Sequence, residues 1–142
     1  MSLSWAVAVF FADQAAKLWA AGLNQPKEVI PGLLRIVSFY NPGFLFGLYR
    51  VSHLKLLTAL ISVLVVYLTL SLLRERQPAR HPIAVGVGLI WGGMAGNLLD
   101  RLLFGAVLDF ISLWRIPVFN LADTALTFGA IFVLTAFLFR KN

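Results

Sequence analysis

Four long apolar segments constrain this chain more than any other feature. They run over about residues 3–23, 54–73, 83–104 and 121–139, and each approaches the roughly 20 residues that a helix needs to cross a bilayer. Only 13% of the 142 residues are charged and 60% are hydrophobic, whereas soluble domains average about 25% charged residues. The composition therefore disfavours a soluble α-helical domain. It predicts a single-domain membrane protein, residues 1–142, mainly α, with four transmembrane helices.

The basic residues predict the orientation of these spans. An even number of spans places both termini on one side, together with the short linker between the second and third spans. That linker carries Arg74, Arg76 and Arg80, and Arg140 and Lys141 close the chain. The positive-inside rule then places both termini in the cytoplasm. Because the net charge of +6 is spread between apolar blocks and not along one face, we expect no binding of nucleic acid.

The N-terminal segment and the first outer loop complete the expected architecture. The apolar N-terminus lacks a basic leader and a small-residue cleavage site, so we expect a retained first span. In the loop, about residues 24–53, a β-prone run over 33–40 follows the turn signal Pro31-Gly32. Asn41-Pro42-Gly43 is a second turn signal. We therefore expect a small β-rich cradle at the outer membrane–water boundary, between the first and second helices.

Four of the six acidic residues are aspartates in or beside the apolar segments: Asp13, Asp100, Asp109 and Asp123. A carboxylate at the centre of a membrane helix costs about 2.5–3.5 kcal/mol on the insertion scale. Such residues are expected to serve a purpose, and three of these four fall between positions 100 and 123. They indicate where the chemistry lies.

Two of these aspartates have basic residues nearby in the sequence. Asp13 and Lys17 are four residues apart, so they share one helix face and are expected to form a structural ion pair. Asn97, Asp100 and Arg101 share a face at the outer end of the third span. An arginine beside an aspartate favours the ionised carboxylate. We therefore expect Arg101 to neutralise Asp100, which would then act as a structural anchor.

The other two, Asp109 and Asp123, have no basic neighbour of their own. Asn120 can cap the fourth helix, with Asp123 in its first turn, and alone Asp123 would be interpreted as an acid stabilised by the helix dipole. A hairpin over residues 114–117 would bring both carboxylates together. Two adjacent carboxylates share a proton, so one can activate water while the other polarises a peptide carbonyl. This is the chemistry of an aspartic peptidase.

Other kinds of site and function fit the sequence less well. The chain has no cysteine, which excludes a thiol nucleophile or thiolate metal site, and His53 and His81 are predicted on opposite sides of the membrane. Mg²⁺ or Ca²⁺ bound by three aspartates is a weaker alternative, and we expect no metal and no cofactor. Two other functions stay open. One is a proton-coupled membrane transporter, and the other is a non-catalytic membrane protein that binds lipopeptides.

Five motifs occur in one order along the chain: Asp13-Gln14-x-x-Lys17, Asn41-x-Gly43-x-x-Phe46, the run from Gly92 to Arg101, Val107-x-Asp109-Phe110, and Asn120-x-Ala122-Asp123. In this order and spacing the chain resembles the lipoprotein signal peptidase (signal peptidase II) family, which are four-span bacterial aspartyl peptidases. The resemblance extends over nearly the whole chain. It differs at Leu45, where the family usually has alanine, and in a short segment between Asp109 and Asp123 that would alter a flap over the substrate.

The resemblance implies an endopeptidase that cuts the signal peptide from diacylglyceryl-modified prolipoproteins just before the lipidated cysteine. Asp109 and Asp123 match the catalytic pair, and Asp13 and Lys17 match a structural polar pair. Positions that line or support the active site are matched by Asn41, Gly43, Asn97, Asp100, Arg101 and Asn120. The implied partners are a lipid-modified prolipoprotein, membrane lipids and peptide-antibiotic inhibitors. The implied form is a monomer in the bacterial cytoplasmic (inner) membrane, with its active site near the outer face.

Overall fold

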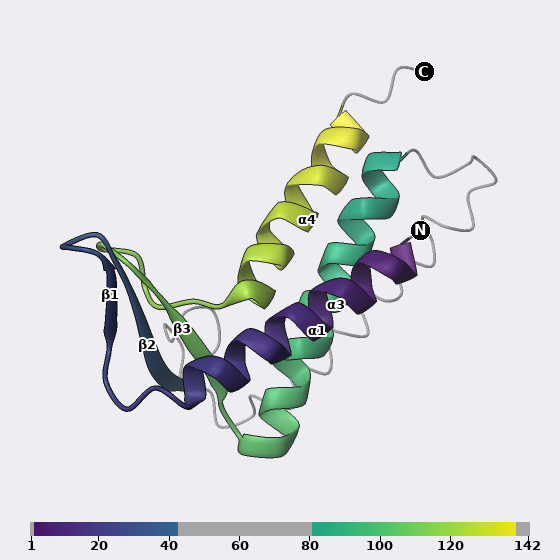
Figure 1. The fold of residues 1–142 in the computed structure, drawn as a ribbon. Coiled ribbons are helices and arrows are strands. Elements are labelled where there is room, and N and C mark those ends of the chain that lie inside the picture. Colours follow the sequence, from purple (N-terminus) through teal and green to yellow (C-terminus); the bar gives the residue numbers. More distant parts are fainter. Residues whose placement is uncertain (1, 43–80, 139–142) are drawn as a thin grey trace.

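The structure is a computed structural model that describes residues 2–42 and 81–138. The described elements are α1 (Ser2–Ala21), β1 (Lys27–Ile30), β2 (Leu34–Asn41), α3 (His81–Phe104), β3 (Val107–Leu113) and α4 (Leu121–Leu138), labelled in Figure 1. The first, third and fourth predicted helices are thus confirmed as helices. The predicted second span, residues 54–73, lies outside the described residues, as do Gly43, Leu45 and the basic linker.

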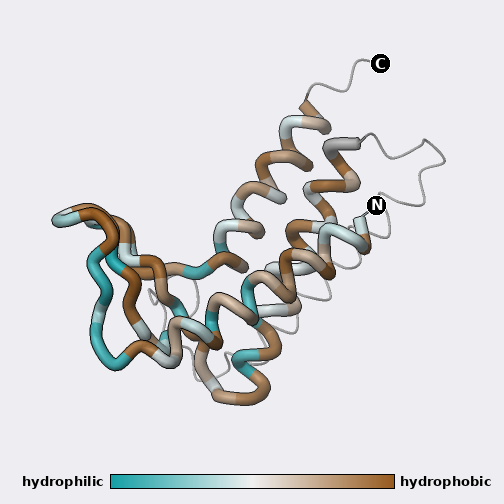
Figure 2. The backbone as a smooth tube through the Cα atoms, viewed as in Figure 1, coloured by the Kyte–Doolittle hydropathy of each residue, from teal (hydrophilic) through white to brown (hydrophobic). Residues whose placement is uncertain are grey.

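The described helices carry apolar surfaces of the kind that suits lipid. Among them, α3 contains one stretch, Ile83–Phe104, that is long and apolar enough to cross a membrane, and α4 contains a shorter apolar stretch, Leu121–Ala136. Figure 2 shows brown, hydrophobic positions along all three helices. Large apolar side chains lie exposed on each of them, including Leu18, Leu103 and Leu134.

Small residues allow these helices to pack with their backbones close together, as in membrane proteins. A Cβ atom added to Gly86 of α3 would lie 2.8 Å from the carbonyl oxygen of Gly129 in α4, and one added to Gly93 would lie 2.5 Å from that of Ala122. Gly92 approaches α1 in the same way, because its Cβ would lie 2.6 Å from the carbonyl oxygen of Ala6. The glycines of α3 therefore bring its backbone close to both α1 and α4.

A three-stranded antiparallel sheet in the order β1-β2-β3 adjoins the helices. Gly32, with φ of 71°, lies in the turn between β1 and β2, as the Pro31-Gly32 signal predicted. The predicted sheet is therefore confirmed, but its third strand was not predicted. β3 comes from the segment after α3 and pairs Asp109 with Phe39 of β2. The second predicted turn begins at Asn41, the last residue of β2, and continues outside the described residues.

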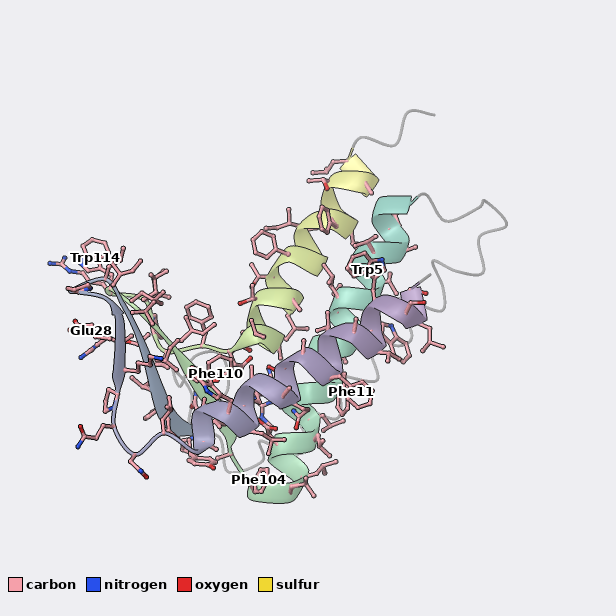
Figure 3. All side chains as sticks on the ribbon, in the orientation of Figure 1. Trp5, Phe11, Glu28, Phe104, Phe110 and Trp114 are labelled. Carbon is pink, nitrogen blue, oxygen red and sulfur yellow. The ribbon has the colours of Figure 1, made fainter. Side chains whose placement is uncertain are left out.

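The sheet lies at one end of the helices, where α1 and α3 end and α4 begins (Figure 1). The start of α1, the start of α3 and the end of α4 lie at the opposite end. Figure 3 shows Trp114 at the outer tip of the sheet and Phe110 between the sheet and the helices. The polar side chains of three helices and one sheet can therefore meet at a single place.

The chain reverses direction after β3, as the predicted hairpin requires. Trp114 adopts a φ of 46° in the turn. Ile111 and Phe119 then form an antiparallel bridge, with N–H···O distances of 2.8 and 3.0 Å. This hairpin returns the chain from Asp109 to Asn120, directly before α4.

Candidate active site

Asp109 is a buried carboxylate in the middle of β3, with only 2% of its surface exposed. Its Oδ2 accepts a 2.8 Å hydrogen bond from Nδ2 of Asn41, and its Oδ1 accepts a 2.7 Å bond from Nδ2 of Asn120. Burial raises the pKa of Asp109 to about 6, and the negative charge of Asp123 adds to the rise, although the two amide donors oppose it. The side chain is thus poised to gain or lose a proton near neutral pH.

Asp123 lies in the first turn of α4, where it forms a reciprocal cap with Asn120. Its backbone N–H donates to Oδ1 of Asn120 at 2.9 Å, and its Oδ2 accepts from the backbone N–H of Asn120 at 3.4 Å. The predicted cap of this helix is therefore confirmed. Its remaining oxygen, Oδ1, accepts a 2.9 Å hydrogen bond from Nδ2 of Asn97 in α3. The cap fixes the carboxylate in place and leaves that oxygen directed at the site.

Two asparagine amides connect Asp109 to Asp123. Nδ2 of Asn120, which bonds to Asp109, also donates to Oδ1 of Asn97 at 3.1 Å. Asn97 in turn donates to Asp123. Both amides are buried. The structure thus brings together Asn41, Asn97, Asp109, Asn120 and Asp123, five residues from four separate elements.

A cluster of buried charges lies next to these amides, and Lys17 of α1 is at its centre. The Nζ of Lys17 lies 2.7 Å from Oδ2 of Asp13 and 2.9 Å from Oδ2 of Asp100. The predicted pair of Asp13 and Lys17 is confirmed. Asp13 also accepts a 2.9 Å hydrogen bond from the backbone N–H of Ala122. The cluster of Asp13, Lys17 and Asp100, hereafter the charge cluster, therefore ties α1 to both α3 and α4.

Asp100 has an ion-pair partner that the sequence did not predict. Lys17 is its ion-pair partner, and Oδ2 of Asp100 also accepts a 3.1 Å bond from the backbone N–H of Leu108 at the start of β3. The charge of Arg101 acts most on Asp123, then on Asp109, and only third on Asp100.

In the folded chain, the positive charges of two basic residues act on Asp109 and Asp123. The charge of Lys17 acts on both carboxylates, and that of Arg101 acts on both as well. Arg101 also donates to the carbonyl oxygen of Asn97 at 3.2 Å. The two carboxylates have no basic residue beside them in the sequence, but the fold supplies two.

Gln14 is a polar residue of this region that belongs to the first motif but was not predicted as a site residue. Its Nε2 lies 3.3 Å from Oδ2 of Asp13, 3.3 Å from the carbonyl oxygen of Gly96 and 3.2 Å from Oδ1 of Asp100. Its position between Asp13 and Lys17 in an otherwise apolar segment is a signal that would have identified it. Within residues 2–42 and 81–138, no group of three or more His, Cys, Asp or Glu side chains is placed to hold a metal.

Known proteins resemble this chain in both sequence and fold. A family model described as signal peptidase (SPase) II matches residues 5–139. A lipoprotein signal peptidase of Moorella thermoacetica is 37% identical over 129 residues, covering 89% of this chain and 85% of the relative. One of Pelotomaculum thermopropionicum is 37% identical over 135 residues, covering 92% and 86%.

A solved structure agrees with these relatives. It is described as a bacterial membrane enzyme determined by the in meso method, and it superposes with a TM-score of 0.85 at 30% identity, covering 96% of this chain and 87% of that one. The match therefore includes the fold as well as the sequence. Because the family model and the relatives cover most of its length, this membrane protein belongs to the signal peptidase II family of peptidases.

Proposed function

We propose that this chain is the peptidase that removes the signal peptide from diacylglyceryl-modified prolipoproteins, with Asp109 and Asp123 as its catalytic pair. One observation carries the assignment of the residues: the two carboxylates are bridged by the amides of Asn97 and Asn120. The raised pKa of Asp109 agrees with it. Perturbed acids that converge in one place are candidates for catalysis.

The pair can carry out peptide hydrolysis in two steps while it shares one proton. The ionised carboxylate accepts a proton from water as the water oxygen attacks the peptide carbonyl carbon. The protonated carboxyl donates its proton to the carbonyl oxygen, which gives a tetrahedral diol. The first carboxyl then returns its proton to the leaving nitrogen as the C–N bond breaks, and the second carboxylate takes a proton from a diol hydroxyl as the carbonyl re-forms. Protons balance, and the pair ends with one proton, as it began.

The membrane placement is part of the proposal. The chain crosses the bacterial cytoplasmic (inner) membrane four times, with both termini in the cytoplasm and the sheet at the outer face. The arrangement of Figure 1 supports it, because the starts of α1 and α3 and the end of α4 lie opposite the sheet. A substrate with its lipid tails in the bilayer would present its scissile bond at the sheet end, where Asp109 lies. We expect the enzyme to act as a monomer and to bind membrane lipids and peptide antibiotics.

The remaining predicted site residues have supporting roles in this proposal. Asn41, Asn97 and Asn120 donate hydrogen bonds to the carboxylate pair, defined as Asp109 and Asp123. Asp100 joins the end of α3 to the start of β3 through the N–H of Leu108, and Arg101 donates to the carbonyl oxygen of Asn97 in its own helix. Gly43 keeps its predicted place in the site as an expectation from the sequence.

A transporter is less well supported. A proton relay needs acids at several depths that are free to exchange protons. Asp13 lies within α1, and its carboxylate is held by Lys17 and by the backbone N–H of Ala122. The other described aspartates gather at the sheet end of the helices, so no relay across the helices is built from them.

The substrate assignment is tested with two matched precursors in proteoliposomes. One carries the diacylglyceryl group on its cysteine, and the other has serine at that position. We expect cleavage of the first only, with a product that begins at the lipidated cysteine by mass spectrometry. Binding of the lipidated precursor without turnover, or proton flux without cleavage, would contradict the proposal and favour one of the two alternatives.

A further inference from the structure

Lys17 makes one contact more than a structural ion pair needs. An ammonium group has three N–H donors, and Nζ of Lys17 has three acceptors: the carboxylates of Asp13 and Asp100 and, at 3.0 Å, Oδ1 of Asn97. The side chain is only 4% exposed. Its third contact reaches out of the charge cluster and into the amides that bridge the carboxylate pair.

This contact determines which way the amide of Asn97 is turned. An ammonium can only donate, so the oxygen of Asn97 must face Lys17, and its Nδ2 then faces Oδ1 of Asp123 at 2.9 Å. The same oxygen accepts from Nδ2 of Asn120. The orientation of the Asn97 amide, with its Nδ2 group toward Asp123, therefore depends on the ammonium of Lys17 as well as on the carboxylate of Asp123.

The orientation of the Asn120 amide is fixed by a contact of its oxygen with the backbone of α4. The backbone N–H of Asp123 can only donate, so Oδ1 of Asn120 must face it, at 2.9 Å. The Nδ2 group of Asn120 is thereby directed to Asp109 and to the oxygen of Asn97. With both ends fixed, each carboxylate of the pair receives an N–H donor from an amide.

We propose that Lys17 is a positioning residue for the peptidase reaction, because its bond to Asn97 fixes the polarity of the amide that donates to Asp123 and accepts from the Asn120 amide. The inference rests on the proposed function of the carboxylate pair. Without the ammonium, the amide of Asn97 can turn its oxygen toward Asp123, and the donor to that carboxylate is lost.

The consequence is a change in the pH range of activity. Within residues 2–42 and 81–138, the positive groups that act on the carboxylate pair are Lys17 of α1 and Arg101 of α3, while Asp13 and Asp100 adjoin Lys17. N–H donors and positive charge both favour ionised carboxylates. Losing Lys17 removes the contact that orients the N–H donor to Asp123 even where the net charge of the cluster is kept, so the pair would give up its protons at higher pH. Both limbs of a bell-shaped pH–rate profile would then move upward.

The test replaces Lys17 without changing the charge of its cluster. Lys17→Met alone would leave two buried carboxylates without a cation, which threatens folding. Lys17→Met combined with Asp13→Asn keeps the net charge of the cluster, because +1 and two −1 charges become a single −1 on Asp100. Asp13→Asn alone is the matched control, since it keeps the contacts of Lys17 with Asn97 and Asp100. Folding of each variant is checked by thermal unfolding in detergent.

We expect the double variant to move both limbs of the kcat profile upward by about half a pH unit or more. We also expect kcat to fall by about tenfold or more at the parental optimum, since general acid–base catalysis contributes about 10²–10⁴-fold. The KM for the lipidated precursor should stay within about twofold of the parental value, because a positioning residue contacts no substrate. The Asp13→Asn control keeps the donor and removes one negative charge beside Lys17, so its limbs should not move upward.

A purely structural role for Lys17 would lower the yield or the rate equally at all pH values and leave both limbs in place, and that result overturns the inference. A triple variant, Lys17→Met with Asp13→Asn and Asp100→Asn, carries no buried charge in the cluster and is measured in parallel with the same expectation. If Asp109→Asn and Asp123→Asn variants are inactive while the Lys17 variants keep the parental limbs, only this inference fails. If those aspartate variants stay active, the proposed function itself fails.

Discussion

The Nδ2 group of Asn120 donates a 2.7 Å hydrogen bond to Oδ1 of Asp109, from a position eleven residues further along the chain. The same asparagine caps α4 through the backbone N–H of Asp123. One side chain thus begins the helix that carries one carboxylate and binds the other. The start of α4 and the geometry of the site cannot be changed independently.

Substitutions at Asn120 should separate these two roles. Asn120→Ser keeps an oxygen that can cap α4 but cannot reach Asp109, whereas Asn120→Ala loses both contacts. We expect the free energy of unfolding of the Asn120→Ser variant to exceed that of the Asn120→Ala variant by about 1 kcal/mol, the usual contribution of an N-cap. Both should lose about 10–100-fold in kcat, because a hydrogen bond to a charged group contributes about 1.5–3 kcal/mol. Thermal unfolding and precursor cleavage measure the two effects, and a Ser variant with parental kcat would contradict the role given to the amide.

The buried carboxyl of Asp109 should make stability depend on pH. Its pKa rises from a usual value of 3.8 to about 6 in the folded chain, so the folded state binds the proton more tightly than the unfolded state. The stabilisation is therefore complete below about pH 4 and is lost as the pH rises through about 6. A shift of about two pKa units corresponds to roughly 3 kcal/mol.

Asp109→Asn is the matched variant for this effect, because asparagine does not titrate and its new contacts contribute equally at every pH. We expect the free energy of unfolding of the parental chain, relative to the variant, to fall between pH 4 and 7. Unfolding by SDS in mixed micelles measures it. A difference that is flat, or that grows with pH, would show that burial does not raise the pKa of Asp109.

Gly93 should be intolerant of even one added carbon. A Cβ there would lie 2.5 Å from the carbonyl oxygen of Ala122 and 3.0 Å from the side chain of Leu126, so α3 and α4 would have to move apart next to Asp123. Overpacking of this kind costs about 1–3 kcal/mol, and we expect Gly93→Ala to lose activity as well. Gly22→Ala is the control, because its nearest contact would be an ordinary 3.5 Å. Equal stability of the two variants by thermal unfolding would contradict the close packing.

Features that depend on neighbours in the sequence could be predicted from it. The pair of Asp13 and Lys17 follows from a spacing of four residues on a helix, and the cap by Asn120 follows from its place before an apolar run. The turn between β1 and β2 follows from the signal Pro31-Gly32. Each is decided within a few residues, so no knowledge of the fold is needed.

The contacts that were not predicted join distant segments. The lysine that pairs with Asp100 comes from another helix, so its place in the sequence did not predict the contact. The pairing of β3 with β2 was also not predicted, because the sequence of one strand does not specify which strand it pairs with. The same limit hid the contact of Lys17 with Asn97, on which the further inference depends.

The most direct test of the catalytic pair is cleavage of a diacylglyceryl-modified precursor by Asp109→Asn and Asp123→Asn variants, measured beside the parental chain in proteoliposomes at matched amounts of folded protein. The account predicts that each variant still binds the precursor but loses at least about 10²-fold in rate, the lower end of what one acid–base group contributes. Cleavage by either variant at near the parental rate would contradict the assignment of Asp109 and Asp123 as the catalytic pair.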